Sequence, residues 1–361
     1  MSALFDPIRL SGVDFPNRIM VAPMCQYSAI DGVMQDWHLA NLGQIAMGGP
    51  GLVFIEATGV EAAGRITPGC VGLWNDAQEE AMGRVVAFCR SVGQSKMGLQ
   101  IGHAGRKGSS HKPWDGGHAL APNEGAWETF APSALPADEG WHVPTALDQA
   151  GLARIREGFV QAAERAARIG LDVLEVHCAH GYLLHEFLSP VANRRADAYG
   201  GSLEGRLRFP LEVVRAVRAV WPEDRPLFVR VSATDWLEDG ESWDLDQTVA
   251  FAEALGREGV TAIDVSSGGM SPKQKIPLGP GYQVFHAAEI RRRTGLPTVA
   301  VGMITEPAQA DMIVRSGQAD MVALAREFLR DPRWTWRAAR ALGAKSASTP
   351  PQYLRAANLP R

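Results

Sequence analysis

Eight short apolar runs recur along the chain, and most are followed by Gly, Pro or polar residues and then by a stretch with helical periodicity. Each run is apolar at successive positions, which is typical of a parallel strand buried on both faces. The runs occupy residues 18–22, 52–55, 97–101, 171–176, 227–231, 262–265, 298–301 and 321–324. Eight strand–helix units over roughly 300 residues predict an α/β protein with a (β/α)8 TIM barrel. We expect residues 1–361 to form this one domain.

Two segments between the runs have clear helical character. Residues 152–169 place apolar side chains on one helix face, and a second helix is predicted over 306–316 with Thr305 as its N-cap. The segment 102–144 is different, because it is rich in Gly, Pro, Trp and His and has no sustained periodicity. We expect it to be a long loop insert after the third strand that acts as a lid, before a helix that starts near Thr145.

Composition narrows the class of partner. Hydrophobic residues make up 46% of the chain and the formal net charge is -4, which argues against a disordered chain and against a nucleic-acid binder. The cysteines include no Cys-x-x-Cys pair, so neither an iron–sulfur cluster nor a dense disulfide framework is indicated. No signal peptide or membrane span is recognisable. We therefore expect a cytoplasmic protein that acts on a small molecule.

The end of the fourth run carries the densest group of reactive side chains. His177, His180 and Tyr182 leave this predicted strand together, and the active site of a (β/α)8 barrel lies at the carboxyl ends of its strands. Two histidines at this spacing could bind a metal, polarise a carbonyl group or satisfy buried hydrogen bonds. A zinc site needs a third ligand and a carboxylate nearby, where the sequence has Gln100 and Arg230. We therefore favour a site without a metal.

Three basic or glycine positions at other strand ends indicate an anionic ligand. Arg230 stands inside the fifth run, where it either faces a ligand, which we favour, or forms a buried ion pair with Glu175 or Asp264. At the last two strand ends, Gly302 allows close backbone approach and Arg326 offers a bidentate fork, which suits a phosphate. Because no Gly-rich dinucleotide fingerprint follows any run, the pattern indicates a phosphate-bearing cofactor held in another way.

Several motifs resemble those of one enzyme family. The longest is HCAHGYLLHEFLSPVANRRADAYGGS at 177–202, after the fourth strand. The others, in chain order, are APMCQYS, QIGHAGRK, PLFVRVSA, PGYQVFHAAEI and AVGMIT. The chain is thereby similar over nearly its whole length to the old yellow enzyme family of FMN-dependent ene-reductases. Its Cys-x-Tyr after the first strand and its C-terminal Gln-Tyr-Leu-Arg resemble the bacterial NADPH dehydrogenase and xenobiotic reductase branch, the thermophilic-like group.

The resemblance implies a non-covalently bound FMN. The residues that match the family's cofactor site are Pro23, Met24, Cys25, Gly59, Gln100, Arg230, Gly302, Ala325 and Arg326. Within this set the resemblance implies that Gln100 pairs with the pyrimidine edge of the flavin and that Arg230 holds negative charge near N1 and O2. Cys25 would tune the flavin potential without acting as a nucleophile. Gly59 stands where relatives often have Ala, and Ala325 stands where they commonly have Gly. Because all these residues are small, we expect an adjusted affinity for FMN and not its loss.

The resemblance also implies roles for the cluster after the fourth strand. His177 and His180 would donate hydrogen bonds to the carbonyl oxygen of an α,β-unsaturated substrate, with a further hydrogen bond from Tyr27. Hydride would pass from N5 of FMN to the β carbon, and Tyr182 would supply a proton to the α carbon. NADPH or NADH would reduce the flavin first, giving ping-pong kinetics in one shared pocket. Nitro compounds would be further acceptors.

Relatives also pass a tail arginine into the neighbouring subunit. Arg355 is the matching position, so the tail 344–361 is expected to complete the substrate site of a second copy in a homodimer or homotetramer. The aromatic residue that often follows this arginine is replaced by Ala356. A second class of function, a flavin-binding sensor without turnover, is disfavoured because His177, His180 and Tyr182 are all present.

Overall fold

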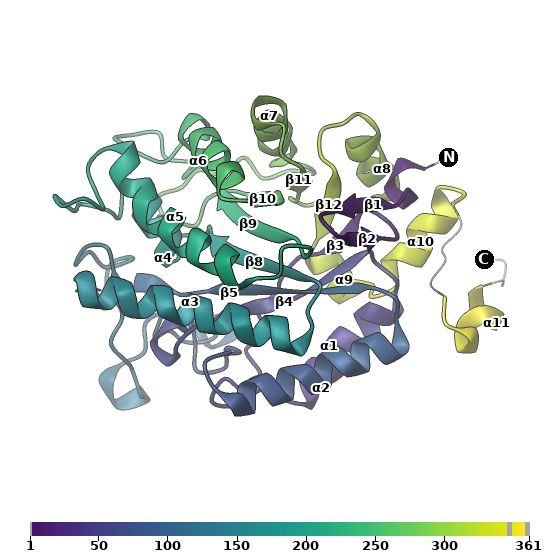
Figure 1. The fold of residues 1–361 in the computed structure, drawn as a ribbon, viewed down its shortest axis with the longest axis horizontal. Coiled ribbons are helices and arrows are strands. Elements are labelled where there is room, and N and C mark those ends of the chain that lie inside the picture. Colours follow the sequence, from purple (N-terminus) through teal and green to yellow (C-terminus); the bar gives the residue numbers. More distant parts are fainter. Residues whose placement is uncertain (1, 345–348, 358–361) are drawn as a thin grey trace.

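The centre of the fold is a closed barrel of eight parallel strands (Figure 1). The computed structural model describes residues 2–344 and 349–357. In chain order the barrel strands are β3 (Ile19–Val21), β4 (Leu52–Gly59), β5 (Lys96–Gly102), β8 (Val173–Cys178), β9 (Leu227–Ser232), β10 (Ala262–Ser266), β11 (Thr298–Ala300) and β12 (Met321–Leu324). Chain neighbours pair in parallel, and β12 closes the ring on β3. The predicted (β/α)8 barrel is confirmed, with a strand at each of the eight apolar runs.

Helices cover the outside of the barrel and connect its strands. They are α1 (Asp36–Met47), α2 (Asp76–Val92), α3 (Gln149–Ile169), α5 (Leu203–Val220), α6 (Leu245–Arg257), α7 (Val284–Thr294) and α8 (Pro307–Arg315), with α9 (Arg326–Arg330) and α10 (Trp334–Ala341) after the last strand. The prediction of Thr305 as the cap of α8 is wrong by one residue. Glu306 is the N-cap, because Pro307 suits the first helical position and keeps the residue before it extended.

Alternation along the strands builds two separate apolar cores. One core packs between strands and helices, and it includes Val53 and Val229. The other core fills the barrel interior with the side chains of the neighbouring positions in the same strands, such as Phe54 and Phe228. A hairpin of β1 (Ile8–Leu10) and β2 (Val13–Phe15) adds Leu10 and Phe15 to this inner core. Because successive side chains in a strand point to opposite faces, residues two positions further along the inner rows also point inward.

Those inner rows change from apolar to polar toward the carboxyl ends of the strands. After Phe228 and Ala262 on β9 and β10 come Arg230 and Asp264, and Glu175 follows Val173 on β8 in the same way. The three polar side chains are buried, at 6%, 0% and 0% exposure respectively for Arg230, Asp264 and Glu175. The barrel interior is therefore apolar at its lower levels and polar near the carboxyl ends of the strands.

The predicted insert after the third strand is longer than any other loop, but it is not structureless. Short 3-10 turns occur at η3 (Gly105–Lys107), η4 (Pro113–Asp115) and η5 (Pro122–Glu124). The expected helix start near Thr145 is wrong, because β7 (Thr145–Ala146) pairs with β6 (Phe130–Ala131). Helix α3 begins at Gln149, where the Asp148 carboxylate accepts a hydrogen bond of 2.7 Å from the Gly151 amide.

The C-terminal segment lies far from the insert. It comprises η6 (Pro351–Tyr353) and α11 (Leu354–Ala357), and Figure 1 places α11 at the end of the molecule where the N-terminus lies, away from α4 (Leu183–Leu188). Tyr353 holds the segment to the barrel, since its hydroxyl accepts a 2.9 Å hydrogen bond from Arg333. The exposed Arg355 is therefore outside the site of its own barrel.

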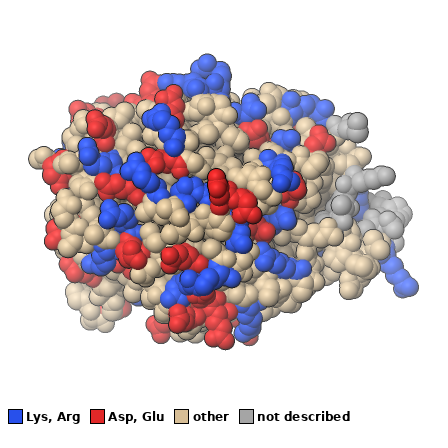
Figure 2. All heavy atoms as spheres, in the orientation of Figure 1, with Lys and Arg blue, Asp and Glu red and all other residues tan. Residues whose placement is uncertain are grey.

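Charges of both signs are interspersed over the face shown in Figure 2. Many are paired, as where Glu79 of α2 binds Arg165 and Arg168 of α3 at 2.5 Å and 2.8 Å. This face has no patch of a single sign that would attract a polyanion. Over residues 2–344 and 349–357, none of the helices combines the length and apolarity needed to cross a bilayer.

Candidate active site

A chain of buried polar side chains crosses the barrel beneath the predicted site. The Gln100 amide donates to a Glu175 carboxylate oxygen at 2.8 Å, and Arg230 Nε lies 3.1 Å from Asp264 Oδ2. Burial raises the pKa of Glu175, and the nearby Asp264 carboxylate raises it further. Burial likewise raises the pKa of Asp264, against the opposing charge of Arg230. Two carboxyl groups thus share one guanidinium inside the barrel.

Arg230 has the ion pair that we considered the less favoured reading of the sequence. Its partner is Asp264, the residue beside it in the parallel register of β9 and β10. The same charge also acts toward the carboxyl end, because Arg230 lowers the pKa of both His177 and His180 after the larger effect of burial. Arg230 therefore links the buried acids below to the histidines above.

His177, His180 and Tyr182 form a compact aromatic cluster at the end of β8. The His177 ring lies edge-on to the His180 ring at 5.2 Å and to the Tyr182 ring at 5.1 Å, measured between ring centroids. His180 has a left-handed backbone with φ of 60°, which turns the chain sharply after the strand. Its amide donates to Ser232 Oγ at 2.9 Å and fixes that turn. The three predicted catalytic side chains are thus brought together.

Both histidines are neutral at physiological pH. Burial lowers the pKa of each well below the usual value, and the charge of Arg230 lowers it further. The Ala179 amide donates to Nδ1 of His177 at 3.2 Å, so the neutral ring carries its proton on Nε2. In His180 it is Nε2 that is engaged, at 2.6 Å from Ser266 Oγ. The pair therefore offers hydrogen bonds without a positive charge.

Tyr182 is a protonated phenol at the start of α4. Burial raises its pKa well above the usual value, and nearby Cys25 and Tyr27 raise it further. The Lys107 ammonium lies 5.0 Å from the centroid of the Tyr182 ring. A phenol beside a cation in a half-buried site can donate its proton to a stronger base, and the phenolate is then reprotonated.

The loop after β3 brings Cys25 and Tyr27 to the same end of the barrel. Its backbone is held by Glu56, whose carboxylate accepts a 2.9 Å hydrogen bond from the Gln26 amide and lies 3.3 Å from His38 Nε2. Burial raises the pKa of Cys25 well above the usual value, so this residue is a neutral thiol. That protonation state fits the predicted role of Cys25 as a non-nucleophilic neighbour.

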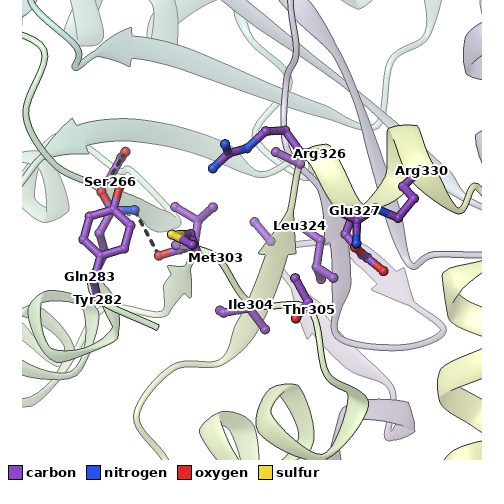
Figure 3. A pocket seen from close by; sticks show the side chains of 14 residues that line it. Ser266, Tyr282, Gln283, Met303, Ile304, Thr305, Leu324, Arg326, Glu327 and Arg330 are labelled. Carbon is purple, nitrogen blue, oxygen red and sulfur yellow. Dashed lines mark hydrogen bonds and ion pairs between the residues drawn. The ribbon is translucent and has the colours of Figure 1, made fainter. Parts of the chain in front are cut away.

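A cavity of about 350 Å³ opens beside the cluster, between the ends of β10, β11 and β12 (Figure 3). Its wall includes Ser266, Tyr282, Gln283, Gly302, Ala325 and Arg326. Gln283 closes one side, because it donates to the Val301 carbonyl at 3.0 Å and accepts from Ser267 at 2.6 Å. In Figure 3 the Arg326 guanidinium points toward Tyr282 and away from Glu327.

The cavity suits the phosphate end of FMN. Glu327 is already paired with Arg330 and Arg337, at 3.3 Å and 2.6 Å, so the Arg326 guanidinium faces the cavity without an ion pair among the described residues. Gly302 has φ of 135°, where other residues are strained, and an added Cβ would lie 3.1 Å from Gln283 Nε2. An exposed arginine beside a glycine backbone matches the chemistry of a phosphate site, so these residues fit the phosphate of FMN.

The predicted cofactor residues fall into neighbouring groups. Gly302, Ala325 and Arg326 line the cavity just described, and Gln100 and Arg230 belong to the buried polar chain. Pro23 and Met24 are half-buried in the loop after β3. Gly59 lines a further cavity of about 20 Å³ with His177 and Tyr182. Of the predicted site residues in the described ranges, Arg355 is the one that lies apart.

The sequence interpretation assigned no role to Tyr282, Gln283 and Lys107. Tyr282 and Gln283 follow a Gly-Pro-Gly turn at 279–281 and directly precede α7, a position from which a loop can line a strand-end site. Lys107 stands in the QIGHAGRK motif at the third strand end. In each case the signal was present, but the chain spacing does not reveal the direction of the side chain.

Between residues 2 and 344 and from 349 to 357, no three His, Cys, Asp or Glu side chains converge as a metal site would require. Nδ1 of His177 and Nε2 of His180 are both engaged in hydrogen bonds.

Comparison with known sequences identifies one family over most of the chain. Residues 3–344 match the family described as NADH:flavin oxidoreductase / NADH oxidase. An NADH:flavin oxidoreductase from Gibberella zeae is 46% identical over 345 residues, covering 91% of this chain and 83% of the relative. An NADPH dehydrogenase from Geobacillus sp. strain WCH70 is 42% identical over 354 residues, covering 98% of both.

Solved structures show the same likeness. Morphinone reductase in complex with tetrahydroNAD has a TM-score of 0.76 at 30% identity, covering 98% of this chain and 94% of that one. The old yellow enzyme homologue from Zymomonas mobilis has a TM-score of 0.78 at 26% identity, with 99% of each chain covered. The resemblance drawn from the strand-end motifs is confirmed.

Proposed function

The chain belongs to the NADH:flavin oxidoreductase / NADH oxidase family, and from this premise we propose that it is an ene-reductase that saturates the activated C=C bond of α,β-unsaturated carbonyl compounds. It is an FMN-dependent enzyme that takes its electrons from NADPH or NADH. The observation that carries the proposed substrate class is the cluster of two neutral histidines and a protonated tyrosine. This set can bind a carbonyl oxygen and protonate a carbon beside it.

The histidines are proposed to bind the substrate oxygen. His177 has its proton on Nε2, because Nδ1 accepts from the Ala179 amide, so this nitrogen can donate to a carbonyl. His180 donates through Nδ1 in the tautomer in which the Ser266 hydroxyl turns from Gln283 Oε1, at 3.3 Å, and donates to His180 Nε2, at 2.6 Å. Two neutral donors stabilise negative charge that develops on the oxygen and do not hold an anionic ground state too tightly. Nitro groups present the same kind of oxygen.

Tyr182 is proposed to protonate the α carbon. Its raised pKa keeps the hydroxyl protonated across the physiological range, and its ring is oriented by the T-shaped contact with His177. The O–H bond breaks as a C–H bond forms, and a phenolate remains until solvent returns the proton. Tyr27, from the loop after β3, is proposed to add a hydrogen bond to the same ligand.

FMN is proposed to lie across the carboxyl ends of the strands. When bound, it supplies the hydride that reaches the β carbon of the substrate. Arg326 and the backbone near Gly302 would hold its phosphate, while Gln100 and Arg230 would face its pyrimidine edge from below. The reductant and the enone would use the same face in turn, which gives ping-pong kinetics.

Removing the cavity arginine is expected to weaken FMN binding selectively. In Arg326→Gln the affinity for FMN should fall by about 10-fold to 100-fold, because a charge-assisted hydrogen bond contributes about 1.5–3 kcal/mol. The affinity for riboflavin, which has no phosphate, should be unchanged. Flavin fluorescence quenching on titration of stripped enzyme measures both constants. An equal loss for the two flavins would place the phosphate elsewhere.

We also propose that Arg355 acts in a neighbouring subunit of a homodimer or homotetramer. It is exposed and lies on the far side of its own barrel from α4. Arg355→Ala should raise KM for the enone by about 10-fold through loss of a charged contact, whereas Arg257→Ala on the surface of α6 should not. Mixing Arg355→Ala subunits with Tyr182→Phe subunits should restore activity, because each supplies what the other lacks. A fully active monomer would contradict tail exchange.

Turnover with 2-cyclohexenone tests the proposed substrate class. The account predicts that purified enzyme with NADPH forms cyclohexanone, with one NADPH consumed for each molecule of ketone. Consumption of NADPH without any saturated product, with oxygen as the only acceptor, would refute the ene-reductase assignment. We also propose that the protein works in the reducing cytoplasm, where its four free cysteines would stay reduced.

A further inference from the structure

Lys107 is a half-buried cation at the centre of three loops. It ends the turn η3 after β5, and its ammonium donates to the His180 carbonyl at 2.8 Å and to the Gly269 carbonyl at 3.1 Å. These oxygens belong to the loops after β8 and β10. On its other side the ammonium lies 5.0 Å from the centroid of the Tyr182 ring. A single charge thus contacts the backbone of His180 and the face of the phenol.

The loops after β8 and β10 are in close contact beside Lys107. A Cβ at Gly181 would lie 2.1 Å from the Gly269 carbonyl oxygen, and a Cβ at Gly269 would lie 2.5 Å from the His180 Cα. All three residues have positive φ, at 60° for His180, 71° for Gly181 and 92° for Gly269. An ammonium that donates to one carbonyl of each loop therefore links these two closely packed backbones.

We propose that Lys107 is the positioning residue of the proton-transfer step: its ammonium fixes the loop that carries His180 and Tyr182, and its charge stabilises the phenolate left when Tyr182 protonates the substrate. This inference rests on the proposed role of Tyr182 as the acid. In the step, the Tyr182 O–H bond breaks, the proton joins the α carbon, and negative charge appears on the phenol beside the ammonium. Solvent then returns a proton to the phenolate.

A solvent route to this position exists on the side of the insert. Lys107 lines a cavity of about 220 Å³ together with Asp138 and Trp141 of the insert and Met270 of the loop after β10. None of the described residues that line this cavity belongs to the proposed substrate site. This cavity is the proposed source of the solvent that returns the proton.

Lys107 is surrounded by groups that set its charge. Burial lowers its pKa to about 8, with Glu186 raising and Arg106 lowering it in smaller measure. Burial also raises the pKa of Glu186 to about 8. His177 and His180 face the ammonium from the β8 loop and Asp138 from the insert, and the two histidines are neutral in this range. Lys107 is therefore charged below about pH 8 and loses its charge as the pH rises through that value.

Substituting Lys107 by Met should slow proton transfer and leave electron entry intact. The rate at which 2-cyclohexenone oxidises the reduced enzyme, measured by rapid mixing, is expected to fall by about 10-fold to 300-fold. A charge 5.0 Å from the phenolate ring at an effective dielectric constant of about 20 stabilises the phenolate by up to this factor. Reduction by NADPH should keep its rate. So should oxidation by ferricyanide, which takes electrons without protonating a carbon. Lys107→Arg, which keeps the charge, should recover most of the loss.

Lys275→Met is the matched control. Lys275 lies on the loop after β10 with a side chain that is 69% exposed, and it pairs with Glu238 away from the cluster. This variant should behave as the wild type in all three reactions. If Lys107→Met slows NADPH reduction and ferricyanide oxidation as much as enone reduction, the lysine is merely structural and the proposal is overturned. An unchanged enone rate overturns it as well.

The pH profile separates the charge of Lys107 from that of its neighbour. In the wild type the rate with 2-cyclohexenone should decline as the pH rises through about 8, which gives the pH profile a falling limb. In Lys107→Met this limb should be absent. In Glu186→Gln the limb should persist at lower pH, because the lysine loses the carboxylate that raises its pKa. A limb that survives in Lys107→Met, or that disappears in Glu186→Gln, would assign the titration to another group.

A spectroscopic titration supplies a readout independent of turnover. The chain has six lysines, so 13Cε-lysine labelling of the holoenzyme gives few resonances. One of them should titrate near pH 8 and be missing in Lys107→Met. If all six titrate at ordinary lysine values, the proposal fails.

In the Tyr182→Phe background, Lys107→Met should add little further loss. If Tyr182→Phe is itself fully active, the proposed acid is wrong, which is a separate failure.

Discussion

Replacing Tyr182 by Phe is expected to slow oxidation of the reduced enzyme by 2-cyclohexenone by about 10²-fold to 10⁴-fold, the usual contribution of a positioned general acid. The ring contact with His177, at 5.1 Å between centroids, is kept by Phe, so the substrate site should retain its shape. Reduction by NADPH needs no proton from this phenol and should keep its rate. Rapid mixing under anaerobic conditions, with flavin absorbance as the signal, separates the two half-reactions.

Tyr199→Phe is the matched control for this experiment. Its hydroxyl is 3.4 Å from the Glu212 carboxylate on α5 and its ring contacts Phe209, so both half-reactions should match the wild type. The pH dependence gives a second check. Because the pKa of Tyr182 is raised well above the usual value, the wild type should show no loss attributable to this phenol at neutral pH. Unchanged enone reduction by Tyr182→Phe would mean that another group is the acid.

Removing the charge of Arg230 is expected to destabilise the fold more than any surface substitution. Asp264 is fully buried at 3.1 Å from Arg230 Nε, and the Glu175 carboxyl is buried beside it. Arg230→Met leaves both acids without their cation, and breaking a buried pair in this way costs about 3–5 kcal/mol. The free energy of unfolding from urea titration measures the loss. Arg292→Met removes an exposed pair with Glu289 and should cost at most about 1 kcal/mol.

The pH dependence of this loss has a definite sign. Burial raises the folded-state pKa of Asp264, and removal of Arg230 raises it further because the guanidinium opposes that shift. A carboxyl group with a raised folded-state pKa binds more protons in the folded state, so it lowers stability as the pH rises above its unfolded value. The deficit of Arg230→Met should therefore be smaller at pH 5 than at pH 7. Equal deficits at both values would argue that Asp264 is not the group left unpaired.

The barrel could be predicted from the sequence because its signal is local. Each barrel strand lies in a mostly apolar run of the sequence, and the predicted and observed bounds differ by a few residues at most, as at β3 and β4. The two errors have different causes, one a competing local signal and the other a contact between segments distant in the sequence. Thr305 is a good cap by type, but Pro307 fixes the helix start one residue later. Thr145 pairs with β6, a contact to another part of the insert that no local pattern reveals.

The grouping of the candidate residues could be predicted from the sequence, but their pairing could not. His177, His180 and Tyr182 are close in sequence, and the turn after β8 brings them together. The hydrogen bond of Gln100 to Glu175 and the ion pair of Arg230 with Asp264 depend instead on the register between neighbouring strands. Lys107 contacts residues 73 and 162 positions away along the chain. Only the closed barrel brings such positions together.

The absorbance spectrum under anaerobic conditions tests the central claim most directly. The account predicts a yellow protein whose flavin band is bleached by one equivalent of NADPH and restored by 2-cyclohexenone, with cyclohexanone as the product. Colourless protein, or a flavin band that NADPH does not bleach, would contradict the assignment of an FMN-dependent oxidoreductase. A band that is bleached by NADPH and restored by oxygen, but not by 2-cyclohexenone or another activated alkene, would contradict the proposed reaction.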